Sequence, residues 1–174
     1  MTSSKKRISL AIADDRTSVS VDNWPGERSP YRVSTANRAD RPDISRLPAQ
    51  LREAIGDRRQ HGGQVKGRIL YAKQDLLGER EPVVVGALIL HLEGDAPQIL
   101  QLGTAEAKSG PDREQLMNVM LACAAAVAIE LKSRVLLWLV HSEEAAVSAT
   151  RYDFRRLPKA RNSPRGVIRL IREL

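Results

Sequence analysis

The chain has 174 residues, which fits one domain with a tail. Hydrophobic residues make up 42% of it, enough for a core, but aromatic residues make up only 3%, so aliphatic side chains and alanine must fill the interior. The net charge of +7 favours acidic partners such as nucleic acid or phosphates. An arginine excess of this size can equally serve solubility alone.

The single cysteine, Cys123, excludes an intrachain disulfide and a cysteine-based zinc site. Its apolar neighbours indicate a core residue rather than a nucleophile, and one free thiol suits a reducing compartment. The basic residues 1–7 are not followed by an apolar run of signal-peptide length. The apolar segment 116–131 is short for a membrane span and contains Asn118 and Glu130. We therefore expect a soluble, cytoplasmic protein with no membrane contact.

The start of the chain differs in composition from the rest. Residues 1–29 are rich in Ser, Thr, Asp, Lys and Arg, which predicts a flexible segment. Ile8, Leu10 and Ile12 alternate with other residues, which is compatible with one short strand there. The folded domain is predicted over residues 30–174.

The first half of this domain reads as strands around one helix. Leu47, Leu51 and Ile55 recur at a spacing of four, which predicts a helical face, and Asp43 is the expected N-cap. Residues 83–92 are rich in β-branched side chains and give the strongest strand signal. The elements predicted here are a strand at 31–35, a helix at 47–56, a strand at 64–72 and a hairpin of strands at 83–92 and 97–103.

The second half contains a long helix that is apolar on nearly every side. Such a helix is buried, usually against a sheet. The strand after it, at 135–140, has no polar alternation, so both of its faces should be covered. A short helix at 143–151 with Ser142 as N-cap and a strand at 154–157 follow. Residues 166–174 fit either a helical stripe or a terminal strand, and we favour the strand.

This order of elements resembles the GNAT family of acyl-CoA-dependent N-acetyltransferases, over residues 30–174. The resemblance rests on three places. They are Tyr31-Arg-Val33 with Asp43 and Leu47, the hairpin 83–103 running into the helix at Leu116, and Trp138-Leu-Val-His-Ser-Glu-Glu-Ala-Ala146 followed by Tyr152-Asp-Phe154. The resemblance implies an α/β (α+β) domain with a central mixed, mostly antiparallel sheet and helices on both faces. An unrelated α/β domain is the remaining alternative; it would show no splay between strands 97–103 and 135–140.

In that family two neighbouring parallel strands splay apart and hold the pantetheine arm of acetyl-CoA or another acyl-CoA. The resemblance implies that its amides pair with the backbone of residues 98–105, and that its pyrophosphate lies on the N-terminus of the long helix, where unpaired N–H groups attract anions. An amine then attacks the thioester directly.

The segment that corresponds to the family's phosphate-binding loop, residues 108–113, departs from the family pattern. Lys108 falls at the family's basic position, but Pro111 and Arg113 stand where glycines are expected, and Pro111 removes an N–H donor. Asp112 and Glu114 add negative charge, which is also ordinary chemistry for the start of a helix. The residues that the resemblance leaves for the cofactor are Leu102, Gly103, Thr104, Lys108, Gly110 and Arg113.

The catalytic candidates are equally altered. The family places a proton-donating tyrosine five residues before the closing Phe154, where this chain has Ala149. Tyr152, three residues further on, is the nearest phenol, and packing is its alternative role. Glu106 and His141 are the candidates for the general base. The three histidines show no metal-ligand spacing.

Two functions therefore compete. The first is acyl-CoA-dependent transfer of an acetyl or related group to an amine of a small molecule or protein. The second is a degenerate GNAT-like module that binds an acidic partner or nucleic acid through its basic C-terminal segment. That segment could equally be a solvated edge strand protected by charge. Its cations are Arg155, Arg156, Lys159, Arg161 and Arg165.

Overall fold

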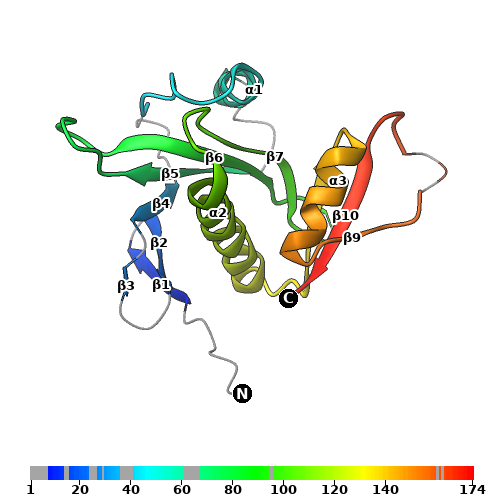
Figure 1. Cartoon of the computed structure of the whole chain (residues 1–174). Coiled ribbons are helices and arrows are strands. Elements are labelled where there is room, and N and C mark those ends of the chain that lie inside the picture. The colour runs from blue at the N-terminus through cyan, green and yellow to red at the C-terminus, as the bar shows by residue number, and fades with distance from the viewer. Residues whose placement is uncertain are drawn as a thin grey trace.

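The computed structural model describes residues 8–13, 16–23, 27–28, 30–35, 41–60, 67–94, 96–159, 161 and 163–174. They form one sheet and three α-helices (Figure 1). The helices are α1 (Ala49–Gln60), α2 (Gly110–Glu130) and α3 (Glu143–Ala149). The strands are β1 (Ile8–Ala13), β2 (Arg16–Asn23), β3 (Glu27–Arg28), β4 (Tyr31–Thr35), β5 (Gly67–Gln74), β6 (Val83–His91), β7 (Gln98–Thr104), β8 (Val135–Val140), β9 (Arg155–Arg156) and β10 (Ile168–Glu173).

The sheet is mixed and mostly antiparallel, as the resemblance implied. Its strand order is β1-β2-β4-β5-β6-β7-β8-β10-β9, and β3 pairs with β2. Among the described strands, β7 and β8 are the parallel pair, and every other pairing is antiparallel. The parallel pair arises because α2 carries the chain over the sheet between these two strands.

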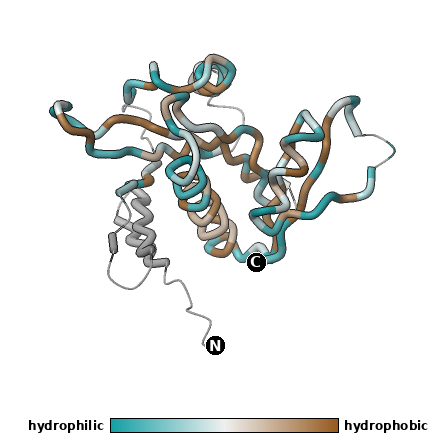
Figure 2. The backbone as a smooth tube through the Cα atoms, in the orientation of Figure 1, coloured by the Kyte–Doolittle hydropathy of each residue, from teal (hydrophilic) through white to brown (hydrophobic). Residues whose placement is uncertain are grey.

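Helices cover both faces of the sheet (Figure 1). Successive residues of a strand point to opposite faces, and neighbouring positions accordingly belong to two separate cores. Leu70 and Leu88 pack in the cluster that contains α2, whereas Tyr71 and Ala87 pack in the cluster under α1. Helix α3 shares the α2 core. Figure 2 shows the central strands as largely hydrophobic.

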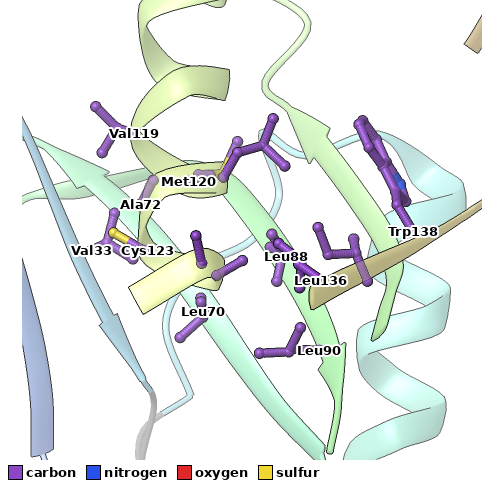
Figure 3. Packing of buried hydrophobic residues seen from close by; sticks show 14 of the residues in the cluster. Val33, Leu70, Ala72, Leu88, Leu90, Val119, Met120, Cys123, Leu136 and Trp138 are labelled. Atoms are coloured by element: carbon purple, nitrogen blue, oxygen red, sulfur yellow. The ribbon is translucent and has the colours of Figure 1, made fainter. Parts of the chain in front are cut away.

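Helix α2 is the centre of the larger core (Figure 3). Its many small side chains let it lie close to the strands, and Gly86 of β6 shows how close. A Cβ added there would lie 2.9 Å from the Sδ of Met120. The sequence prediction of a buried helix is confirmed. The buried residues of α2 are Leu116, Val119, Met120, Leu121, Cys123, Ala124, Ala125, Ala126, Val127 and Ala128.

Helix α1 packs just as closely on the other face. A Cβ added to Gly103 of β7 would lie 2.9 Å from the Cδ2 of Leu51. Real Cβ atoms do not approach so closely, so a glycine at this position allows Leu51 to fill the core. The predicted helical face of Leu47, Leu51 and Ile55 is confirmed, because all three are buried.

Other sequence predictions are confirmed with small corrections. Helix α1 begins after Pro48 rather than at Leu47, and Asp43 does not cap it. Instead the Asp43 Oδ1 accepts a hydrogen bond from the Ser45 backbone N–H at 2.9 Å, within the preceding turn. The terminal segment is a strand, β10, and the helical alternative is wrong.

The N-terminal region contains the short strand that the alternation of Ile8 and Leu10 allowed, as β1, and also β2 and β3, which were not expected. Strand β2 pairs with β4 and continues the sheet. The division of the chain into a flexible segment 1–29 and a domain 30–174 stays a prediction. Within the part of the chain that is described, no helix is both long and apolar enough to cross a membrane.

Candidate active site

The sheet opens between its two parallel strands. Strands β7 and β8 pair only at Gln98 with Leu137 and at Ile99 with Trp138. Next to these pairs, the Leu137 backbone N–H donates a hydrogen bond of 2.9 Å to the carbonyl of Pro97, the residue just before β7. Beyond these pairs β7 continues to Thr104 and β8 to Val140, with no further pairing between them. The strands therefore part, contrary to what an unrelated α/β domain would show.

The parting leaves backbone groups of β7 free to bind a ligand. The Ala105 N–H donates to the Val85 carbonyl at 2.7 Å, and Gly103 pairs with Ala87 in the same ladder. Alternate residues of an antiparallel strand turn their backbone groups to opposite sides. The N–H and C=O groups of Leu102 and Thr104 thus point away from β6, into the gap that β8 leaves.

A cleft of about 710 Å³ lies at this opening. Strands β7 and β8 contribute its floor, the first turns of α2 form one wall, and α3 with the turn after it forms the other. A volume of this size suits a ligand of drug or cofactor dimensions. The residues that line the cleft are Leu102, Gly110, Pro111, Arg113, Glu114, Met117, Trp138, Ser142, Glu144, Ala145, Ser148, Arg151 and Tyr152.

The start of α2 is open to a ligand. Its N-cap, Ser109, has no side-chain hydrogen bond to the helix, and Pro111 stands in the first turn. Gly110 has φ +54°, a conformation that glycine adopts without strain. The N–H groups of the first turn have no partner within a helix, and the helix dipole adds a partial positive charge. Arg113 supplies a full charge beside them, and Glu114 opposes it.

The opposite wall presents one face of a helix and its 3₁₀ extension. The Ser142 Oγ accepts from the Ala145 N–H at 3.1 Å and caps α3, as the sequence predicted. Helix α3 ends at Ala149 and a 3₁₀ turn, Thr150–Tyr152, continues it. This turn places Arg151 and Tyr152 on the cleft.

Tyr152 is half-buried beside three charged groups. Burial is the main cause that raises the pKa of its phenol above the ordinary value of 10.0, and Glu114 raises it further. Arg113 and Arg151 lower the same pKa by a smaller amount. The phenol therefore keeps its proton at neutral pH and can donate a hydrogen bond or the proton itself.

The cofactor residues expected from the sequence do not all lie on the cleft. Leu102, Gly110 and Arg113 line it. Gly103 faces α1, so only its backbone belongs to this region. Thr104 is the one buried polar residue among the described side chains. Lys108 is directed elsewhere, because its Nζ donates to the Gln74 Oε1 at 2.5 Å and lies 5.3 Å from the centre of the Tyr31 ring.

The expected catalytic residues are also divided. Tyr152 lines the cleft, whereas Glu106 is exposed in the turn after β7 and does not line it. His141 lies at the end of β8 and lines a second, neighbouring pocket. Among the described side chains, no group of three or more His, Cys, Asp or Glu residues could hold a metal ion.

Several cleft residues were missed by the sequence analysis, most clearly Glu144, Ser148 and Arg151. A spacing signal was present, because positions 144, 148 and 151 recur at intervals of four and three, as one face of a helix does. Trp138 was named only within the buried strand and the segment 138–146 that carries the resemblance, and not as a site residue. It is buried, and its ring meets Phe154 edge to face, with centroids 5.3 Å apart and an interplanar angle of 73°.

The architecture is that of the GNAT acetyltransferases. The IAA acetyltransferase from Bacillus cereus ATCC 14579 superposes with a TM-score of 0.58 at 17% identity, over 83% of this chain and 99% of that one. A GNAT family acetyltransferase from Elizabethkingia anophelis with acetyl-CoA bound gives 0.59 at 15% identity, over 84% and 100%. An acetyltransferase from Streptococcus agalactiae 2603 gives 0.56 at 14% identity, over 83% and 99%.

These similarities concern the fold of the backbone, at sequence identities of 14–17%. No protein-family model matches the chain, and no curated protein matches it in sequence. The likeness to these acetyltransferases is therefore one of fold.

Proposed function

We propose that the protein is an N-acyltransferase that uses acetyl-CoA or a related acyl-CoA to acylate an amine. The observation that supports this most strongly is the parting of β7 and β8 over the N-terminus of α2. It provides in one place a free strand edge for the amides of an extended ligand and a helix start for its phosphates. A structure of the same fold was solved with acetyl-CoA bound.

The residues of the cleft fit such a ligand. Leu102 and Thr104 offer backbone donors and acceptors to the pantetheine amides. Arg113 and Arg151 face the cleft from opposite walls and would hold the phosphates between them. Pro111 removes one backbone donor and Glu114 adds a negative charge, so we expect weaker binding than a glycine-rich loop would give.

The reaction needs one proton removed and one supplied. The amine nitrogen attacks the carbonyl carbon of the thioester, so that a C–N bond forms and the C–S bond breaks. The amine loses a proton to a base, and the leaving thiolate takes one. Tyr152 is our candidate donor, because its phenol lines the cleft and stays protonated at neutral pH.

His141 is the preferred candidate base among the two expected from the sequence. It directly precedes Ser142, which lines the cleft. Glu106 is exposed and does not line the cleft, so it could remove a proton from an amine in the cleft only through a bridging water. A base must come within hydrogen-bond reach of the proton that it removes, directly or through one water.

The alternative function, a basic module for an acidic partner or nucleic acid, has less support. Two of the cations assigned to it are engaged in ion pairs, Arg155 with Glu173 and Arg156 with Glu143. These pairs are exposed and therefore weak. The C-terminal region does not interleave these cations with exposed aromatic rings, as stacking on bases requires.

The experiment that tests the proposal measures thiol released from acetyl-CoA in the presence of a panel of amines. The protein's own thiol should not interfere, because Cys123 is buried and burial raises its pKa to about 12. Amine-dependent release of thiol at a saturable rate is the expected result. Tight acetyl-CoA binding without release by any amine would favour a non-catalytic protein.

A further inference from the structure

A second pocket adjoins the cleft at the junction of β8 and α3. Its volume is about 360 Å³. Its walls come from the end of β8, the start of α3, the segment after β9 and the start of β10. Ser142 lines both this pocket and the cleft. The two spaces are therefore neighbours across one side chain.

The pocket carries an excess of positive charge. Arg156, Lys159 and Arg169 line it, and Glu143 is the one acidic side chain among its lining residues. Glu143 forms an ion pair with Arg156. Lys159 and Arg169 have no ion-pair partner among the residues that the structure describes, so their charges are available to a ligand.

The rest of the lining limits what the ligand can be. Leu157, Pro158, Val167 and Ile168 contribute apolar surface beside the exposed cations, which suits a ligand with an apolar stem and an anionic end. The volume admits a molecule of amino-acid size, at the low end of ligand pockets. No aromatic ring lines the pocket, so a stacked base is not favoured.

From these contacts we infer that this pocket binds the acyl acceptor, and that the acceptor is a small amine carrying a carboxylate or phosphate group; the inference rests on the proposed function. The anionic end lies on Lys159 and Arg169. The amine end lies toward His141 and Ser142, at the boundary with the cleft.

This placement gives each proton of the transfer a route. The amine gives up its proton to His141 as its nitrogen bonds to the thioester carbon. The thiolate that leaves takes the proton of Tyr152, which lines the cleft at the other end of α3 from Ser142. The products are an amide and a free thiol, and the proton that His141 has taken up returns to the Tyr152 phenolate through solvent, so no further reactant is needed.

The test compares matched probes that differ in the anionic group. 4-Aminobutyrate is set against 4-aminobutanamide, and O-phosphoethanolamine against ethanolamine, by calorimetric titration into the full chain saturated with CoA. We expect the anionic member of at least one pair to bind about tenfold or more tightly, as a charged hydrogen bond would give. The pair that shows the larger difference identifies the group as carboxylate or phosphate. Equal affinities within both pairs, or no binding of either anionic probe at millimolar concentration, would overturn the inference.

Two double variants, each of which removes two positive charges, distinguish binding in the pocket from attraction by the protein's overall positive charge. Lys159→Gln with Arg169→Gln should abolish the preference for the anionic probe. Arg161→Gln with Arg165→Gln should preserve it, because neither residue lines the pocket although both are exposed, as Lys159 and Arg169 are. An equal loss in both double variants would contradict the inference.

A separate titration with acetyl-CoA keeps the two proposals apart. Failure of acetyl-CoA to bind the wild-type chain would contradict the proposed function. Binding of acetyl-CoA with no preference between the probes would contradict only the acceptor pocket.

Discussion

The cleft combines a phenol with charges of both signs. Tyr152, Arg151 and Arg113 stand against Glu114 and Glu144 around one opening in the sheet. Such a site can bind a polyanion only where the cations lie closer to it than the acids do. Substitutions of single residues therefore separate binding from proton transfer.

Replacing Tyr152 with Phe should lower kcat by about a hundredfold or more, with little change in the KM for acetyl-CoA, because only the proton donor is lost. The raised pKa fixes the pH dependence. The wild-type rate should not fall with the loss of this proton until the pH exceeds the ordinary phenol value of 10.0. Steady-state rates of both proteins across pH check this. A fall in the wild-type rate between pH 7 and 9 that is absent in the variant would contradict the role.

Charge substitutions on the cleft should change acetyl-CoA affinity in opposite directions. Arg113→Gln and Arg151→Gln should each weaken binding by about three- to tenfold, since both side chains are exposed and partly screened. Glu114→Gln should tighten it. Lys108→Gln is the matched control, because Lys108 contacts Gln74 and the Tyr31 ring instead of the cleft. Titration calorimetry of the four variants measures this, and a larger loss for Lys108→Gln than for Arg113→Gln would contradict the assignment.

Among the elements, β7 and α1 are held at a spacing that only glycine permits. The Cδ2 of Leu51 lies where a Cβ of Gly103 would stand. The same strand turns the backbone of Leu102 and Thr104 to the cleft. The packing of α1 on one face thus supports the edge of β7 that faces the cleft.

Gly103→Ala should therefore destabilise the fold by about 1–3 kcal/mol, the usual cost of overpacking a core. Gly56→Ala is the control in α1 itself, where an added Cβ meets nothing within 4 Å. That change should stabilise the protein by about 0.5–1 kcal/mol, because alanine is the better helix former. Urea unfolding of both variants measures the difference. A neutral Gly103→Ala would show that the spacing is looser than the structure indicates.

Element order could be predicted from the sequence, because burial leaves a clear pattern. The apolar segments allowed α2 and β8 to be located in the sequence, and Ser142 as an N-cap predicted where α3 begins. The position of Tyr152 on the cleft could not be predicted by counting from Phe154. Ala149, at the expected position, is fully buried, and the 3₁₀ turn after it brings Tyr152 to the surface of the cleft.

At the scale of the whole molecule, the decisive feature is where pairing between β7 and β8 stops. The alternation of side chains along a strand does not depend on how far its backbone pairs with a neighbour. The sequences of β7 and β8 would therefore look the same if the strands paired along their whole length. The direction of the Lys108 side chain could not be predicted from the sequence for a similar reason. Its partner, Gln74, lies 34 residues away along the chain, beyond the reach of local patterns.

We propose above that the opening between β7 and β8 binds an acyl-CoA. The most direct measurement is calorimetric titration of the purified full chain with acetyl-CoA and with CoA, repeated on the Arg113→Glu, Arg151→Glu double variant. We expect saturable binding of both ligands by the wild-type chain and a loss of at least about tenfold in the double variant. Absence of binding at millimolar acetyl-CoA, or equal binding by the double variant, would contradict it.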